Sequence, residues 1–208
     1  MWVDLSWPME DGMPVYPGDR QTCLIQEKSV ERDFYTAYAL HTGLHAGTHM
    51  DAPMHLLENT PGIDEIPLSR CLVQGILLDV RSQQEIKAPE LPEGALAGKA
   101  VLLYTGMDAH YGTDRYYRDH PVVSLDLARR LVEENIAFLG MDMPSPDELP
   151  FPVHRLLLKA GIPIVENLRN LGSLSGPFEV AAFPLRLMAE ASPVRAAARL
   201  LHDKKPLA

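Results

Sequence analysis

The segment HAGTHMDAPMH, residues 45–55, gathers three histidines and one aspartate that can all serve as metal ligands. Imidazole nitrogens and carboxylate oxygens together suit divalent zinc, manganese or iron. The chain has only 8 histidines in 208 residues, so their concentration here indicates a shared task. A polar loop without a shared function is the alternative, and it stays open for any single one of these histidines.

The backbone of this segment is expected to be a shaped loop with an extended stretch. His45 and His49 have a spacing that would also place them on one face of a helix. Gly47 and Pro53 disfavour that helix. In an extended chain His49 and Asp51 project to the same side, and a tight turn at Gly47 can bring His45 beside them.

Outward from this segment, the sequence predicts a protein rich in strands. Short runs of Val, Ile, Leu and aromatic residues cover residues 2–6, 22–28, 34–40, 72–80, 100–104, 137–141, 162–165, 178–187 and 194–200. The last run is ambiguous, because its alanines would also suit a helix. Helices are expected over residues 125–135, capped by Ser124, and over 152–160, with Gly161 after the end. This order predicts one β-rich α/β domain over residues 1–208, with a central strand core and a few covering helices.

Charge and composition argue against several classes of function. A net charge of -9 disfavours a surface that neutralises the phosphates of nucleic acid or anionic lipid. The N-terminal residues show no export signal, and no apolar run is long enough to span a bilayer. A cytoplasmic protein without nucleic-acid or membrane partners is therefore expected. Cys23 and Cys71 have no metal or redox spacing, so both are expected to be small core residues.

One residue far along the chain, Glu166, has a position that calls for a partner. Glu166 ends the apolar strand predicted over residues 162–165, where a buried carboxylate needs a cation or a hydrogen-bonded partner. His154 lies on the second predicted helix, whose other side carries Leu157 and Leu158. Taken alone, His154 is more typical of a solvated or capping histidine.

The segment resembles the signature of the cyclase family of metal-dependent hydrolases, which includes bacterial kynurenine formamidases. The family pattern His-x-Gly-Thr-His-x-Asp-x-Pro-x-His is met at every fixed position of residues 45–55. Residues 16–19, YPGD, are similar to the family's aromatic-Pro-Gly-Asp turn, and residues 140–147, GMDMPSPD, to its Gly-x-Asp-x-x-Ser-x-Asp stretch. His154 and Glu166 stand where the family supplies its two remaining ligands, so the resemblance extends over most of the chain.

This resemblance implies a centre of two divalent metal ions, with zinc as the leading candidate and manganese as the alternative. His45 and His49 would bind one ion, and His154 would bind the other. Asp51 and Glu166 would bridge the two. The resemblance further implies a swivelling β/β/α-type fold with the metals at one end of the strand core. It also implies a homodimer or homotetramer in which the partner subunit helps to complete the pocket.

The implied reaction is hydrolysis of a small amide by a metal-activated water, with His55 as the proton shuttle. The leading substrate is an arylformamide, N-formylkynurenine, which would give kynurenine and formate. In kynurenine formamidases a tryptophan of the early turn contacts the substrate ring. Tyr16 takes that position here; it can stack on an aryl ring, but its hydroxyl changes the size and polarity of the pocket.

Two other functions are kept as alternatives. The same site could open a cyclic amide or lactone such as isatin. A metal-binding or ligand-binding module without catalysis is the other alternative, although such a protein would be expected to lack His55 or a bridging carboxylate, and both are present.

The remaining aromatic residues, methionines and histidines receive no role in catalysis. Core packing is favoured over a place in the pocket for one group, namely Phe34, Tyr35, Tyr38, Met141 and Met143. A surface or structural position is expected for the histidines without an evident partner, namely His41, His110, His120 and His202.

Overall fold

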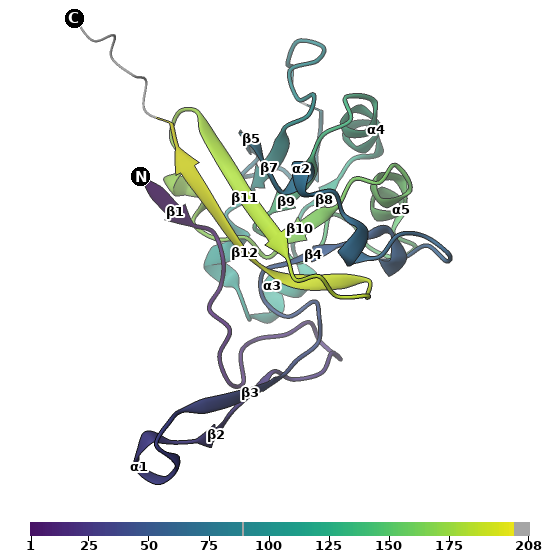
Figure 1. The fold of residues 1–208 in the computed structure, drawn as a ribbon. Helices are drawn as coiled ribbons and strands as arrows, with labels where there is room; N and C mark the ends of the chain where they lie inside the picture. The colour runs from purple at the N-terminus through teal and green to yellow at the C-terminus, as the bar shows by residue number, and fades with distance from the viewer. Residues whose placement is uncertain (89, 202–208) are drawn as a thin grey trace, which may run out of the picture.

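Strand pairing organises residues 1–88 and 90–201, the part of the chain that this computed structural model describes. Eight strands of that part form the main sheet: β1 (Trp2–Asp4), β4 (His49–Asp51), β5 (Leu72–Asp79), β7 (Ala100–Tyr104), β9 (Phe138–Met141), β10 (Ile164–Glu166), β11 (Phe178–Pro184) and β12 (Ala191–Leu200). Their order is β1-β12-β11-β5-β7-β9-β10-β4, and β12 also pairs with β4. The second pairing closes the sheet into a barrel-like ring, with β1 added beside β12 (Figure 1).

The ring combines a parallel half with an antiparallel half. Strands β5, β7, β9 and β10 run parallel, whereas β4, β11 and β12 pair antiparallel with their neighbours. Leu102 on β7 packs into the core inside the ring, while the adjacent Val101 and Leu103 pack into a second core under the helices. Burial on both faces is typical of parallel strands covered by helices.

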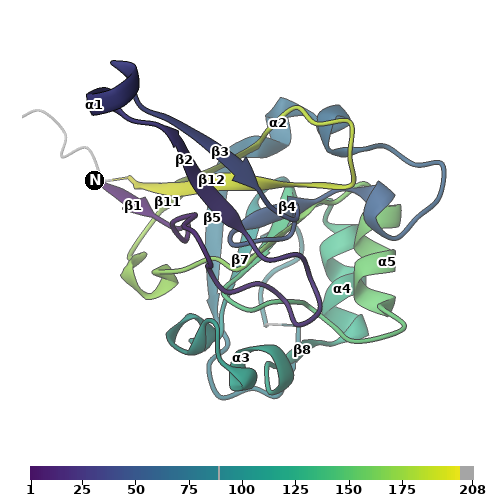
Figure 2. The ribbon, with the colours of Figure 1, turned by 90° about the horizontal axis from the view of Figure 1, so that it is seen from below.

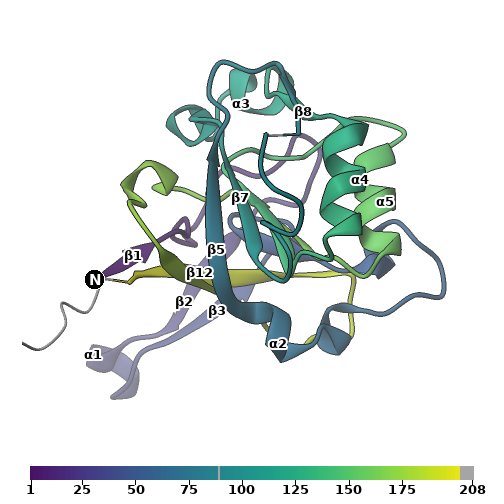
Figure 3. The same cartoon turned by 90° about the horizontal axis from the view of Figure 1, so that it is seen from above.

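Helices α4 (Leu125–Glu133) and α5 (Pro152–Lys159) lie side by side over the outer face of the parallel strands (Figure 3). Ser124 accepts a hydrogen bond from the backbone N–H of Leu127 at 3.2 Å and so caps α4 as predicted. Leu127 and Leu131 of α4 and Leu157 of α5 are fully buried in the second core. The helices therefore close this core and hold α5 against the end of β10.

The predicted strand segments and both predicted helices are confirmed with shifts at their ends, as is the β-rich α/β class. The ambiguous last segment is a strand, because β12 pairs with β11 along its length and with β1 and β4 at its two ends. Short helices and strands that the sequence did not predict are α1 (Val30–Asp33), α2 (Leu68–Cys71), α3 (Asp114–Arg118), β6 (Glu85–Ile86) and β8 (Val122–Val123). Over residues 1–88 and 90–201, no helix is long and apolar enough to cross a membrane.

The strands β2 (Cys23–Lys28) and β3 (Ala37–His41) form a separate hairpin, with α1 (Val30–Asp33) near its tip, that extends away from the ring (Figures 1 and 2). Three aromatic residues expected in the core, Phe34, Tyr35 and Tyr38, are instead 91%, 56% and 54% exposed. Cys23 on this hairpin is only half-buried, whereas Cys71 is buried in the core as predicted. These corrections share one cause: β2 and β3 pair with each other and not with the main sheet.

Replacement of Gly75 by alanine tests the tight packing inside the ring. Gly75 on β5 pairs with Phe178 on β11, and a Cβ atom at Gly75 would lie 2.1 Å from Cε2 of the Phe178 ring. Gly75→Ala is expected to lower the free energy of unfolding in urea by about 1–3 kcal/mol. Gly43→Ala is the control, because its Cβ would meet no described heavy atom within 4 Å; a change below about 0.5 kcal/mol is expected. Equal stability of the two variants would contradict the close contact.

Candidate active site

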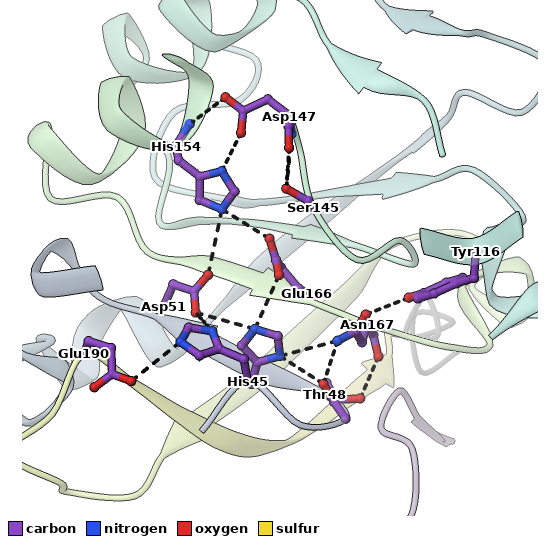
Figure 4. Close-up of polar contacts among 12 residues, drawn as sticks. His45, Thr48, Asp51, Tyr116, Ser145, Asp147, His154, Glu166, Asn167 and Glu190 are labelled. Atoms are coloured by element: carbon purple, nitrogen blue, oxygen red, sulfur yellow. Dashed lines mark hydrogen bonds and ion pairs between the residues drawn. The ribbon is translucent and has the colours of Figure 1, made fainter. Parts of the chain in front are cut away.

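The six residues proposed from the sequence as metal ligands or proton shuttle meet in one cluster, and Figure 4 labels His45, Asp51, His154 and Glu166 of this set. Four secondary-structure elements and one loop contribute to it: β4 carries His49 and Asp51, β10 carries Glu166, α5 carries His154, a short 3-10 helix at Pro53–His55 carries His55, and His45 lies in the loop before β4. The strand pairing sets the distance between the distant parts, because Glu166 lies opposite His49 in the antiparallel pair. The fold thus brings residues more than a hundred positions apart into contact.

Strand β4 presents its side chains as the alternation of a strand requires. His49 and Asp51 point into the cluster, whereas Met50 between them packs in the core of the ring. The preceding Gly47 has φ +64°, a conformation that glycine adopts without strain. Its carbonyl oxygen accepts a hydrogen bond from Nδ1 of His49 at 2.9 Å, which leaves Nε2 of that ring facing the carboxylates. The expected extended stretch and turn at Gly47 are confirmed.

Asp51 directs its two oxygens toward different imidazoles. Oδ1 lies 3.0 Å from Nδ1 of His45 and 3.5 Å from Nε2 of His49. Oδ2 lies 4.0 Å from Nε2 of His154.

Glu166 divides its oxygens in the same way. Oε2 lies 3.3 Å from Nε2 of His49, and Oε1 lies 3.3 Å from Nε2 of His154. Each carboxylate therefore spans two positions, one next to His49 and the other next to His154. Ligand atoms within 4.8 Å of one another form two groups, namely His45, His49 and Asp51, and Asp51, His154 and Glu166.

Several buried polar atoms of this cluster have no hydrogen-bond partner of good geometry among the described residues. They are Nε2 of His49, both carboxylate oxygens of Asp51 and Oε1 of Glu166. Buried polar atoms are nearly always paired, because their desolvation costs several kcal/mol when they are not. Imidazole nitrogen and carboxylate oxygen are the donors that divalent metals take. The residues present therefore fit a divalent cation.

Asp147 fixes the orientation of His154. Its Oδ1 lies 2.5 Å from Nδ1 of His154, and its Oδ2 accepts from the backbone N–H of Val153 at 2.5 Å. This pairing satisfies the first turn of α5 and directs Nε2 of His154 toward the cluster. The expectation that Leu157 and Leu158 lie opposite His154 was wrong. Leu157 and Leu158 follow His154 by three and four positions, so the three residues share one face of α5, and all three side chains are buried.

Asn167 and Tyr116 support the site but were not predicted. Asn167 follows Glu166 with φ +56°, and its Nδ2 donates to the carbonyl oxygen of Gly47 at 2.8 Å. Its Oδ1 accepts from the hydroxyl of Tyr116 at 2.7 Å, and its own carbonyl accepts from Oγ1 of Thr48 at 2.7 Å. These bonds connect the end of β10 to the turn before β4. The position of Asn167 next to Glu166 was the one available signal, and no sequence pattern indicated Tyr116.

Asp142, in the same stretch as Asp147, has a structural position. Its carboxylate accepts hydrogen bonds from the backbone N–H and the hydroxyl of Thr105 and from the backbone N–H of Gly106, at 2.6–2.8 Å. Burial raises the pKa of Asp142 to about 6 despite these bonds. Its neighbours Met141 and Met143 are fully buried, which confirms the preference for core packing.

Charge pairing governs protonation in the cluster. Burial disfavours the charged imidazoles, but the facing carboxylates outweigh it and raise the pKa of His49 to about 9 and that of His154 to about 10. Burial also opposes the charged carboxylates, yet the imidazoles hold the pKa of Asp51 well below its usual range and lower that of Glu166. Protons thus occupy the positions that a metal cation would take.

His55 differs from the other imidazoles of the cluster. Its ring centroid lies 4.4 Å from that of His45 and 6.1 Å from that of His154. Within the described residues it has no carboxylate at ion-pair distance and belongs to neither group of clustered ligand atoms. Burial lowers the pKa of His55 below its ordinary value. A neutral imidazole that ligates nothing can accept a proton and return it.

A cavity of about 600 Å³ opens beside the cluster and reaches His55. Tyr16, Tyr111, Tyr117 and Phe151 line it, so much of its wall is aromatic. The rings of Tyr16 and Tyr117 meet edge to face at 5.7 Å. Of the two positions expected for His120, surface or structural, its burial excludes the surface one, and His120 also lines this cavity.

Binding of a divalent metal is expected to release protons. At pH 7.5 the metal-free His49 and His154 are protonated, because their pKa values are raised to about 9 and about 10. Metal ligation needs neutral imidazoles, so roughly one proton should leave each ring, and affinity should weaken as the pH falls. Zinc titration calorimetry in buffers of different ionisation enthalpy measures this release. Binding heats that do not depend on the buffer would contradict this proton release. The control is Glu133→Gln at an exposed position of α4, which should release as many protons as the unchanged protein.

Comparison with known proteins places these features in a family context. The family described as "Putative cyclase" matches residues 3–148. The kynurenine formamidase of Bacillus cereus is 30% identical over 204 residues, covering 95% of this chain and 97% of the relative. The solved structure of a potential metal-dependent hydrolase with cyclase activity has a TM-score of 0.80 at 25% identity and covers 97% of this chain and 99% of its own. The structure of an isatin hydrolase bound to the product analogue thioisatinate has a TM-score of 0.83 at 21% identity and covers 97% of this chain and 92% of the isatin hydrolase chain. At this identity the similarity is one of fold alone.

Proposed function

The chain belongs to the cyclase family, and we propose that it is a metal-dependent arylformamidase that hydrolyses N-formylkynurenine to kynurenine and formate. The observation that carries this proposal is the set of unpaired buried atoms on His49, Asp51 and Glu166, which suits a divalent cation. Similarity to a kynurenine formamidase over nearly the full length of both chains supports the choice of substrate. The aromatic wall of the cavity supports an aryl group.

Two divalent ions are proposed, with zinc as the leading candidate and manganese as the alternative. His45 and His49 would hold one ion, and His154 would hold the other. Asp51 and Glu166 would bridge them, which is supported by the way each carboxylate turns its two oxygens toward different imidazoles.

When bound, such an ion lowers the pKa of water and polarises the substrate carbonyl. In the hydrolysis, water adds its hydroxyl to the formyl carbon, the C–N bond breaks, and a proton goes to the leaving nitrogen. His55 is proposed to carry that proton, because its ring is neutral, lines the cavity and is not among the clustered ligand atoms. Tyr16 is proposed to contact the aryl ring from the wall of the cavity.

The domain organisation, location, partners and oligomeric state of the protein are also proposed. Residues 1–208 would act as one catalytic domain in the cytoplasm, on a small amide and without nucleic-acid or membrane partners. A homodimer or homotetramer is proposed, supported by the exposed Phe34, Tyr35 and Tyr38 on the hairpin that extends from the ring.

Substitution of two histidines should separate proton transfer from metal binding. His55→Ala is expected to keep its metal and lose at least about a hundredfold in kcat, since general acid–base assistance is typically worth that much. His49→Ala is expected to lose metal as well, because Nε2 of His49 faces both carboxylates. Metal analysis beside steady-state rates measures both effects. Equal loss of metal in the two variants would remove the distinction.

Substrate assays test the amide that is cleaved. The zinc-loaded protein is expected to release formate from N-formylkynurenine with a kcat/KM at least about tenfold above that for opening of isatin, the cyclic-amide alternative. The ratio of the two kcat/KM values is then measured again on protein loaded with manganese. Faster opening of isatin with both metals would favour the cyclic-amide alternative, and no turnover of either by metal-loaded protein would favour the non-catalytic one.

A further inference from the structure

We propose that His120, Asp19 and Glu148 form a hydrogen-bond-accepting subsite that binds an amino group on the substrate's side chain. All three residues line the cavity beside the metal cluster, and none of them belongs to the proposed ligand set. The proposal rests on the arylformamidase function and adds the chemical class of substituent that the enzyme recognises.

His120 is a polar side chain that is buried and yet directed at the cavity. It is 9% exposed, and its Nδ1 lies 3.1 Å from the carbonyl oxygen of Pro121. A carbonyl oxygen only accepts, so Nδ1 carries a hydrogen, and in an imidazole with that tautomer Nε2 is the acceptor. Nε2 has no hydrogen-bond partner among the described residues, while the ring lines the cavity. A nitrogen that opens on the cavity without a protein partner can take a hydrogen bond from a donor on a bound molecule.

Asp19 is brought to the same wall by contacts of the early turn. The backbone N–H of Asp19 donates to the carbonyl oxygen of Tyr16 at 2.9 Å, which closes the turn. The ring of Tyr16 then meets that of Tyr117, three residues before His120, at 5.7 Å. The turn therefore lies against the segment that carries His120.

Glu148 lines the same cavity, and its segment is tied to that of His120 by a backbone hydrogen bond. The backbone N–H of Val123, three residues after His120, donates to the carbonyl oxygen of Pro146 at 2.8 Å. Pro146 precedes Glu148 by two residues, so this bond ties the segment of Glu148 to that of His120. Three accepting groups from separate parts of the chain thus line one cavity.

The charge of the cavity wall selects the sign of the substituent. Four carboxylates line it, two of them, Asp19 and Glu148, in the proposed subsite, and no lysine or arginine does within the described residues. A substrate ammonium can donate to all three groups, and hydrogen bonds that involve a charged donor are stronger than neutral ones. At this subsite a substrate carboxylate would face three acceptors with no lysine or arginine beside them, because the proposed metal ions belong to a cluster that includes none of these three residues. Because Asp19 and Glu148 are exposed, solvent and salt moderate the effect.

A matched series of 2-formamidophenyl ketones tests this selection. The ketone side chains should have equal length and end in an ammonium, a methyl or a carboxylate group. With zinc-loaded protein at low salt, kcat/KM for the ammonium compound is expected to exceed that of the methyl compound by about 5- to 20-fold. The carboxylate compound should be the poorest. Equal values, or a preference for the carboxylate, would overturn the proposal.

Variants assign the preference to the subsite. His120→Ala, and separately Asp19→Asn at an exposed position, are expected to reduce the ammonium-to-methyl ratio at least about threefold. His41→Ala and Glu133→Gln remove a histidine and an acid outside the cavity, so their ratio should match that of the unchanged protein. An unchanged ratio in both subsite variants would overturn the assignment.

Binding of the product amines separates this proposal from the proposed function. The corresponding 2-aminophenyl ketones contain no formyl group, so their dissociation constants, measured by calorimetry on the zinc-loaded protein, do not depend on turnover. Tighter binding of the ammonium ketone supports the subsite even when no formamide is hydrolysed, in which case the arylformamidase function alone fails. Equal binding of the three ketones overturns the subsite even when every formamide is hydrolysed.

Discussion

Two carboxylates held together in a buried space are the constraint on which the rest of this structure depends. Asp51 and Glu166 are 1% and 5% exposed, and both lie within 3.5 Å of Nε2 of His49. An ionised carboxylate is costly to bury unless an opposite charge faces it. The protonated imidazoles of His49 and His154 supply that charge without metal, and a divalent cation supplies it when bound. The arrangement is therefore a cation site that protons occupy in the absence of metal.

The strand that carries this constraint also closes the ring. β4 is three residues long and pairs with β10 on one side and β12 on the other. Its outer residues, His49 and Asp51, face the cluster, whereas Met50 packs in the core. A metal held by the proposed ligands would join β4 to β10 and α5 through side chains, in addition to the backbone hydrogen bonds between β4 and β10. Because the unfolded chain lacks this geometry, binding should favour the folded ring.

The sequence predicted the parts of the site that form a motif within one short segment or that match a motif of a known family. Residues 45–55 contain their ligands within one segment, and the turn at Gly47 follows from glycine's conformational freedom. The place of Glu166 after an apolar strand indicated only that it needs a partner, and family resemblance alone assigned it and His154 to this cluster, because the β4–β10 pairing and the position of α5 bring them there. Most of the strands were also predictable from short apolar runs, since each run has a local composition.

The rest depended on contacts between distant segments, which no local pattern reveals. The alanines of β12 suit a helix locally, and only the pairing with β11 makes the segment a strand. The burial of His120 and the exposure of Phe34 and Tyr38 depend in the same way on which segments pack together. Asn167 acquires its role from hydrogen bonds to Gly47 and Tyr116, residues far away in the sequence.

Different kinds of structure carry the clustered metal-binding groups and the wall of the cavity. The ligand groups on β4, β10 and α5 lie on elements whose pairing and packing fix them within the ring. The cavity wall that would contact the substrate is built largely from turns and short connections, including the turn at Tyr16 and the segment at His120. Loop residues can change at little cost to the fold, whereas ligand residues on paired strands cannot. This construction would allow the same proposed metal chemistry to serve different amides, because the wall can be altered without disturbing Asp51 and Glu166.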